Sequence, residues 1–185
     1  MKSSRLTWPE SLKYKHWCGG VLEQWNTGFF ELKYSTTPLR QYSLSMALAK
    51  KPFAFIRAAR VAHLATAGLD SQPHVIPICF VFDGKYFYSP IDEKPKRTSP
   101  AKLRRVINIQ ANPQAALVID RYSEDWKQLA YVLIGGKAKV LHRGAAHAEA
   151  VRRLRRKYPQ YRQMAIHSRP MIRFTPTRWT FWGNC

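Results

Sequence analysis

The sequence predicts a mainly β domain, an antiparallel β-barrel that is closed or nearly closed and carries flanking helices. Six segments have the length and the apolar, β-branched content of strands, the last holding one strand or two. The turn signal Asp83-Gly84 joins two neighbouring segments as a hairpin, since this pair tolerates the positive φ of tight turns. Successive strands with few helices between them favour an antiparallel barrel over a parallel, doubly wound sheet.

The first half of this domain is predicted as a helix followed by three strands. Helical spacing covers residues 45–60, and a short strand follows at 61–66. Residues 73–82 form one long apolar strand, which the Asp83-Gly84 turn connects to a strand at 85–90. The helix is expected to contact the core through Leu48, Phe53, Phe55 and Ile56.

A second helix is predicted at about 98–110. Thr98 or Ser99 can cap it, and Asn112-Pro113 ends it. Its inward residues are expected to be Leu103, Val106, Ile107 and Gln110.

The rest of the chain is predicted as strands around a third helix. Strands cover 114–120 and 129–143, and the Gly135-Gly136 pair in the second indicates a bulge or a sharp bend. A helix over 145–161 precedes the last strand segment, within 170–183. One side of this helix is expected to carry Val151, Leu154, Tyr158 and Tyr161.

Residues 1–45 differ from the remainder, residues 46–185, which form the predicted barrel domain. They are rich in Trp, Tyr, Gly and Thr and show no sustained helical or strand period. Two interpretations are open: a partly ordered extension, or sequence upstream of a natural start near Met46. Mass spectrometry of the native N-terminus distinguishes them.

Charge is the most unusual feature of the composition. The 185 residues include 31 Lys and Arg against 11 Asp and Glu, a formal net charge of +20. This excess favours a polyanionic partner: nucleic acid, anionic lipid headgroups or a phosphorylated cofactor. The three cysteines form no C-x-x-C pair, which favours a reducing compartment, and no apolar run reaches the roughly 18 residues of a membrane-spanning helix. Without a secretory signal either, the cytoplasm is the expected location.

The sequence is poor in groups for catalysis. The six histidines lack metal-ligand spacing, so no metal site is predicted, and there is no G-x-S-x-G, Walker or G-x-G-x-x-G motif. If the protein is an enzyme, a cofactor is expected to supply the reactive atom, with no catalytic side chain.

A basic corner lies where the strand at 85–90 leads into the second helix. It contains six cations, Lys94, Lys96, Arg97, Lys102, Arg104 and Arg105. Thr98 and Ser99 stand at the helix start, where backbone N–H groups and the helix dipole favour a phosphate. On composition alone, a phosphate site and a solvated basic loop have equal weight.

Four stretches then carry a family resemblance: RVAHLAT, QPHVIPICFVFDGKYFYS, DEKPKRT and KLRRVINIQANPQAALVIDRYSEDW. In this order they resemble the pyridoxamine 5′-phosphate oxidase-like (PPOX class) family, and more narrowly its branch that uses the deazaflavin coenzyme F-420. The resemblance runs from about Ala54 to Gly183. It implies a six-stranded antiparallel split β-barrel, FMN-binding-protein-like, in a homodimer with the cofactor in grooves at the subunit interface.

The resemblance also implies the cofactor site. Lys94, Lys96 and Arg97 match the motif that binds the cofactor phosphate, with Thr98 directly behind them. The remaining matches are the ring-lining segment Val75, Ile76, Pro77 and Ile78, and the strand end near the ribityl–phosphate arm, Tyr88 and Ser89. Trp126 matches a recurrent position for which core packing is the alternative.

Coenzyme F-420 has an oligoglutamate tail beyond its phosphate, which gives the surplus charge an interpretation. A groove from Lys102, Arg104 and Arg105 towards residues 152–157 (RRLRRK) would complement that tail, whereas FMN has one phosphate to neutralise. A solvated helix face is the alternative for RRLRRK.

Two departures from the family pattern stand out. Residues 70–73 read Asp-Ser-Gln-Pro where the family has Asp-Gly-Arg-Pro, so a different turn is expected, aided by Gly68. No substrate-phosphate motif is recognisable near the end of the chain, which argues against pyridoxamine 5′-phosphate oxidation itself.

The function expected on these grounds is a cytoplasmic oxidoreductase that transfers a hydride between coenzyme F-420 and a small organic acceptor. Three alternatives are open. One is the same barrel with FMN or haem, a second is a cofactor carrier without turnover, and a third, more distant, is a basic nucleic-acid-binding module. The sequence does not identify the physiological substrate.

Overall fold

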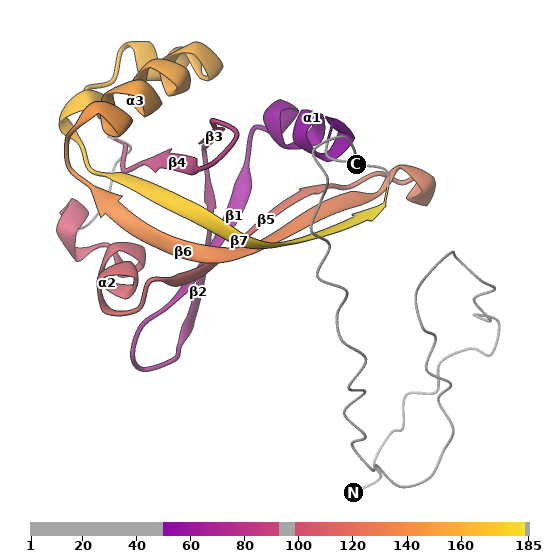
Figure 1. Cartoon of the computed structure of the whole chain (residues 1–185), viewed down its shortest axis with the longest axis horizontal. Helices are drawn as coiled ribbons and strands as arrows, with labels where there is room; N and C mark the ends of the chain where they lie inside the picture. Colours follow the sequence, from indigo (N-terminus) through magenta and orange to yellow (C-terminus); the bar gives the residue numbers. More distant parts are fainter. Residues whose placement is uncertain (1–49, 93–98, 184–185) are drawn as a thin grey trace, which may run out of the picture. The chain divides into compact units, whose positions relative to one another are not determined.

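The computed structural model describes residues 50–92 and 99–183, and the predicted boundary at 45/46 and Leu48 lie outside them. In this part of the chain, seven strands form one antiparallel sheet in the order β2-β1-β5-β6-β7-β4-β3 (Figure 1). The strands are β1 (Ala62–Ala67), β2 (Pro73–Ile78), β3 (Val81–Phe82), β4 (Phe87–Pro90), β5 (Gln114–Arg121), β6 (Ala130–Leu141) and β7 (Met171–Gly183). The helices are α1 (Lys50–Ala58), α2 (Arg104–Ala111) and α3 (Ala145–Lys157), with 3₁₀ turns η1 (Pro100–Lys102), η2 (Trp126–Gln128), η3 (Pro159–Arg162) and η4 (Ile166–Ser168). The predicted mainly β class is confirmed.

The predicted single strand over 73–82 is wrong, because it is two strands at opposite edges of the sheet. β2 pairs with β1, whereas β3 pairs with β4, and only Cys79 and Phe80 separate them. Since the two edge strands are consecutive in the chain, the sheet has to curl until its edges approach each other. The six predicted strand segments therefore become seven strands of a curled, incompletely closed barrel.

The hydroxyl of Tyr158 stabilises this break. It accepts a hydrogen bond from the Phe80 backbone N–H at 3.0 Å, and it lies 2.9 Å from the Phe80 carbonyl and 2.8 Å from the Arg60 carbonyl. Tyr158 directly follows α3 and is buried. Backbone groups that leave the sheet ladder at Phe80 thus find a partner inside the protein, as buried groups require.

Two hydrophobic clusters hold the elements together. The larger one fills the curled sheet beneath α1 and contains Ile56, Leu64, Phe82, Phe87, Ile119, Val132, Ile134 and Phe174 among others. The smaller one lies between α3 and the β3–β4 hairpin, and it includes Val151, Leu154, Tyr158 and Tyr161, the residues predicted on one side of that helix. That prediction is confirmed, although α3 ends at Lys157, before Pro159.

The second helix differs from its prediction in start and register. Residues 100–102 form a 3₁₀ turn, and α2 begins at Arg104 rather than at about 98. Val106 is buried as predicted, but Ile107 is 46% exposed and Gln110 is exposed, while Asn108 and Ile109 are buried in their place. The cause is tertiary, because the Asn108 amide donates to the Thr66 hydroxyl of β1 at 3.3 Å.

The hairpin and the bulge are confirmed. Asp83 N–H donates to the Tyr86 carbonyl at 3.1 Å across the turn, and Gly84 has the positive φ of 105°. The β6–β7 register shifts between Gly135 and Gly136, as the glycine pair predicted.

Residues 70–73 lie in the β1–β2 turn, and Gly68 takes part in it as predicted. Ser71 has φ 55°, so it occupies the left-handed region in the place where the family has glycine. Its N–H donates to the Gly68 carbonyl at 3.2 Å, and the Asp70 carboxylate accepts from the Gln72 N–H at 3.3 Å.

Ser71→Gly is therefore expected to stabilise the domain by about 0.5–1 kcal/mol. Glycine removes the steric strain of a left-handed residue, which contributes about 1–2 kcal/mol. The greater conformational entropy of glycine in the unfolded chain offsets about half of this gain. Urea unfolding measures the difference. Ser123→Gly, at a residue without positive φ, is the control and should destabilise; a matching loss in both variants would contradict the strain at Ser71.

Candidate functional site

The exposed edge of β2 is the first component of the candidate site. β2 pairs with β1 on one side, and no described strand pairs with its other side. Backbone N–H and C=O groups along this edge are thus free to bind a ligand, as edge strands commonly do. The predicted ring-lining residues all lie here: Val75 (59% exposed) and Pro77 point to the outer face, while Ile76 and Ile78 pack against the core.

The start of α2 lies beside this edge. Burial lowers the pKa of His74 in β2, and the charges of Arg105 and Arg104 lower it further, so the two arginines are near that imidazole. The Nδ1 atom of His74 is buried and has no hydrogen-bond partner among the described residues. A neutral imidazole with an unused ring nitrogen therefore lies where β2 meets the basic helix start.

The two arginines have different partners. Arg104 forms an ion pair with Asp70 of the β1–β2 turn, which holds the pKa of that carboxyl below its usual value. Arg105 is half-buried, and burial lowers its pKa while Asp92 opposes the shift. Arg105 is consequently directed inward, towards the chain that precedes residues 93–98, whereas Arg104 is engaged at the turn.

The predicted cofactor-binding residues outside β2 and α2 are either buried in β4 or lie outside the described part of the chain. Lys94, Lys96, Arg97 and Thr98 lie outside the described residues, between Asp92 and Ser99. Tyr88 and Ser89 are buried in β4, and the Tyr88 side chain packs in the cluster under α3, where burial raises its pKa to about 12.

Trp126 lies in η2 between β5 and β6 and is 63% exposed. The alternative of core packing for this side chain is therefore wrong.

A groove of about 490 Å³ crosses the outer face of the sheet and reaches Pro73 at the start of β2. The strand register places one residue from each of five strands in a row on this face: Val75, Ala65, Ala116, Gly135 and Arg178. Small side chains in the middle of the row leave the groove open. Sequence reasoning missed both this row and His74, although strand alternation already placed His74 on the same side as Ile76 and Ile78.

Large apolar side chains are also exposed elsewhere on the outer face. Leu133 and Trp182 are exposed on it, and the Trp182 ring stacks on Tyr131 with centroids 5.6 Å apart. Exposed apolar residues on one contiguous face are typical of a protein–protein interface.

Two negative findings apply to the described residues. They contain no group of three His, Cys, Asp or Glu side chains placed to hold a metal ion. None of their helices is both long and apolar enough to cross a membrane.

A curled antiparallel sheet of this order, with helices outside it and a ligand-accessible edge at β2, defines a split β-barrel. The sequence profile described as pyridoxamine 5′-phosphate oxidase matches residues 48–183, and the chain belongs to this family, as the resemblance implied. The family binds flavin-type cofactors.

Solved structures agree on the fold. A conserved hypothetical protein, Rv2991 of Mycobacterium tuberculosis, superposes with a TM-score of 0.61 at 20% identity over 78% of this chain and 88% of its own. HutZ, a haem storage protein of Vibrio cholerae, gives 0.56 at 14% identity over 71% and 91%. An F420 reductase gives 0.51 at 19% identity over 69% and 94%. A sequence comparison with curated proteins finds no match.

Proposed function

We propose that this protein is an oxidoreductase that transfers a hydride between coenzyme F-420 and a small organic acceptor. The observation that carries the proposal is the meeting of the free β2 edge with the cationic start of α2. The edge offers backbone hydrogen bonds to the polar rim of a planar ring, and Arg105 lies next to it. Bound coenzyme would supply the hydride, because amino-acid side chains are not hydride donors.

The chain's own residues would bind and orient the cofactor. The backbone of Val75, Ile76, Pro77 and Ile78 would line the ring. The end of the strand at Tyr88 and Ser89, whose side chains are buried, would lie near the arm. The phosphate would be held by Lys94, Lys96 and Arg97, with Thr98 beside them. The unpartnered His74 Nδ1 supports this placement, because a buried polar atom without a partner is a natural contact for a ligand.

A homodimer would complete this site. The exposed Leu133 and Trp182 and the small-residue groove support an interface on the outer face, and Val75 connects that face to the β2 edge. Each cofactor would then lie between the β2 edge of one protomer and the surface of its partner, which would exclude water from the ring.

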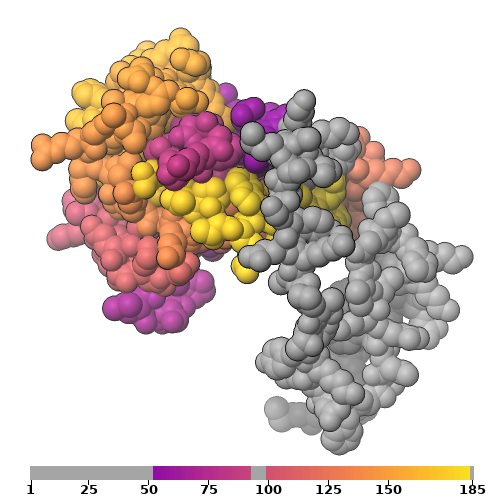
Figure 2. All heavy atoms as spheres, in the orientation of Figure 1, coloured from indigo at the N-terminus to yellow at the C-terminus, as the bar shows by residue number. Residues whose placement is uncertain are grey.

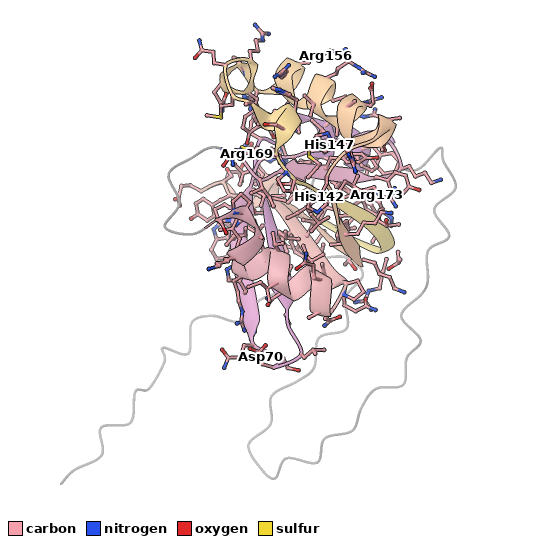
Figure 3. All side chains as sticks on the ribbon, turned by 90° about the vertical axis from the view of Figure 1, so that its left-hand side faces the viewer. Asp70, His142, His147, Arg156, Arg169 and Arg173 are labelled. Carbon is pink, nitrogen blue, oxygen red and sulfur yellow. The ribbon has the colours of Figure 1, made fainter. Side chains whose placement is uncertain are left out.

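The contacts and position of α3 exclude its arginines from the residues expected to bind the anionic tail of the coenzyme. Arg152 and Arg153 form ion pairs with Glu149, and Arg155 donates to the carbonyls of Tyr161 and Met164. Arg156 of this helix and Asp70 beside α2 lie at opposite ends of the described domain (Figure 3). We therefore propose that the anionic tail contacts Lys102 of η1 and Arg105 of α2, with Arg104 shared with Asp70.

Replacing Lys96 and Arg97 together by alanine is expected to raise the dissociation constant for reduced coenzyme F-420 at least about tenfold. Each lost charge-assisted hydrogen bond costs about 1.5–3 kcal/mol of affinity. Fluorescence titration measures binding, which should be saturable at micromolar concentrations in the unaltered protein. The control is Lys127→Ala with Arg143→Ala, which removes the same charge elsewhere; unchanged affinity with lost stability in the test variant contradicts the assignment.

The second candidate is the same fold with FMN or haem. The fold likeness to a haem storage protein and the unused His74 imidazole favour haem, since neutral imidazole is a common axial ligand. The absorbance spectrum of freshly purified protein distinguishes these cofactors. The absorption bands of tightly bound FMN or haem would contradict the coenzyme F-420 proposal. Repeated turnover of a quinone and enone panel would separate an enzyme from a cofactor carrier.

A further inference from the structure

A second pocket, of about 190 Å³, lies between α1, β3 and α3. It shares no lining residue with the groove on the outer face. Its walls are Arg57, Val81, Phe82, Arg153, Arg156 and Lys157. Figure 2 shows the β3–β4 segment (magenta) with α3 (orange) on one side and α1 (indigo) on the other, which is the setting of this pocket.

The helices explain why cations converge here. Arg153, Arg156 and Lys157 are spaced i, i+3 and i+4 along α3, so they share one face of the helix. Arg57 comes from the last turn of α1, on the other side of β3. Four of the six lining residues are therefore basic, and they come from two separate elements.

Little negative charge balances them. Glu149 accepts a hydrogen bond from Arg153 at 2.7 Å and is shared with Arg152. No described carboxylate forms an ion pair with Arg57, Arg156 or Lys157. Three basic residues thus line one small space without an acidic partner in the described part of the chain.

Lys157 is held in an unusual position for an ammonium group. It is half-buried, and its Nζ lies 4.1 Å from the centroid of the Phe80 ring. Burial, and then the nearby charge of Arg60, lower its pKa to about 8. An anion in the pocket would offset both effects, because it would supply the countercharge that the fold does not.

We propose that this pocket binds a phosphate group, either free or as part of a small metabolite, between α1 and α3. Guanidinium groups match the oxygens of phosphate, and an ammonium group adds a point charge. The small volume of the pocket favours a small oxyanion over nucleic acid, which requires an extended basic track. Because Arg57 and Arg156 belong to different helices, a bound phosphate would tie α1 to α3 across β3.

The test is a titration of the full-length protein with inorganic phosphate at constant ionic strength, with chloride as the reference anion. Saturable binding and a rise in the thermal midpoint with phosphate are expected, since a ligand of the folded state stabilises it. Arg57→Gln with Arg156→Gln should weaken phosphate binding at least about tenfold, because each charged hydrogen bond contributes about 1.5–3 kcal/mol. Both side chains are exposed, so this pair should fold normally.

Lys127→Gln with Arg143→Gln is the matched control, because it lowers the net charge equally outside the pocket. Lys157→Met is a second test variant, which retains the apolar stem over Phe80 while it removes the charge. Equal losses of phosphate affinity in the control pair and in the pocket variants would show a non-specific charge effect and overturn the proposal, as would a linear, unsaturable response.

Two further probes identify the source of the phosphate group. Tighter binding of glycerol phosphate than of inorganic phosphate would indicate a metabolite, and equal binding would indicate the free ion; both support the site. Pocket-dependent binding of a short DNA duplex without binding of phosphate would overturn it. Coenzyme titration should be unchanged in Arg57→Gln with Arg156→Gln, so the result is independent of the proposed oxidoreductase site.

Discussion

Gly136→Ala is expected to destabilise the domain by about 3 kcal/mol or more, or to prevent its folding. A Cβ atom at this position would lie 2.2 Å from the Thr175 carbonyl oxygen and 2.7 Å from the Phe174 ring. Neither can move freely, because both belong to β7, the long partner strand of β6, at the bulge. Soluble expression and urea unfolding measure the effect.

Gly135→Ala is the matched control for this substitution. Its Cβ would come no nearer than 3.6 Å to the Arg178 side chain, an ordinary contact with a flexible group. We expect a change in unfolding free energy below about 0.5 kcal/mol, as for substitutions away from packing constraints. If the two alanine variants were equally stable, the close approach of β6 and β7 at Gly136 would be wrong.

Tyr158→Phe is expected to destabilise the domain by about 2–4 kcal/mol. The variant retains the ring but removes the hydroxyl that forms hydrogen bonds with the backbone of Phe80 and Arg60. A buried group left without a hydrogen bond costs about 1–3 kcal/mol, and both the N–H and the carbonyl of Phe80 are affected. The midpoint and slope of urea unfolding give the change.

Tyr122→Phe provides the comparison, since its hydroxyl contacts only the exposed Glu124 at 3.1 Å. A loss below about 0.5 kcal/mol is expected there. Should Tyr158→Phe be as mild as Tyr122→Phe, the hydroxyl would not be what stabilises the separation of β2 from β3.

Gly136 and Tyr158 differ in how far the sequence alone predicts their roles. The Gly135-Gly136 pair indicates a bulge in a strand pattern, and the bulge is present. The role of Tyr158 was only half predictable, because helical spacing places it on the buried side of α3 but does not reveal its hydroxyl's partners. Its bonds join residues 78 positions apart, which no local pattern encodes.

The candidate site likewise contains residues that the sequence predicts and residues that only the structure reveals. The resemblance singled out β2, β4 and the basic corner, and the structure places β2 beside the start of α2. The pairing of Arg104 with Asp70, the unpartnered His74 and the basic pocket at Lys157 came from the structure. Each depends on which side chains the curled sheet brings together.

The amino-acid sequence by itself determined the mainly β class, the Asp83-Gly84 hairpin, the buried side of α3 and a surplus of cations, because each depends on local spacing or composition. Only the tertiary structure decided that residues 73–82 divide between two sheet edges and that α2 turns Asn108 and Ile109 inward. The physical reason is that both outcomes depend on hydrogen bonds to partners distant in the chain, Tyr158 for Phe80 and Thr66 for the Asn108 amide N–H.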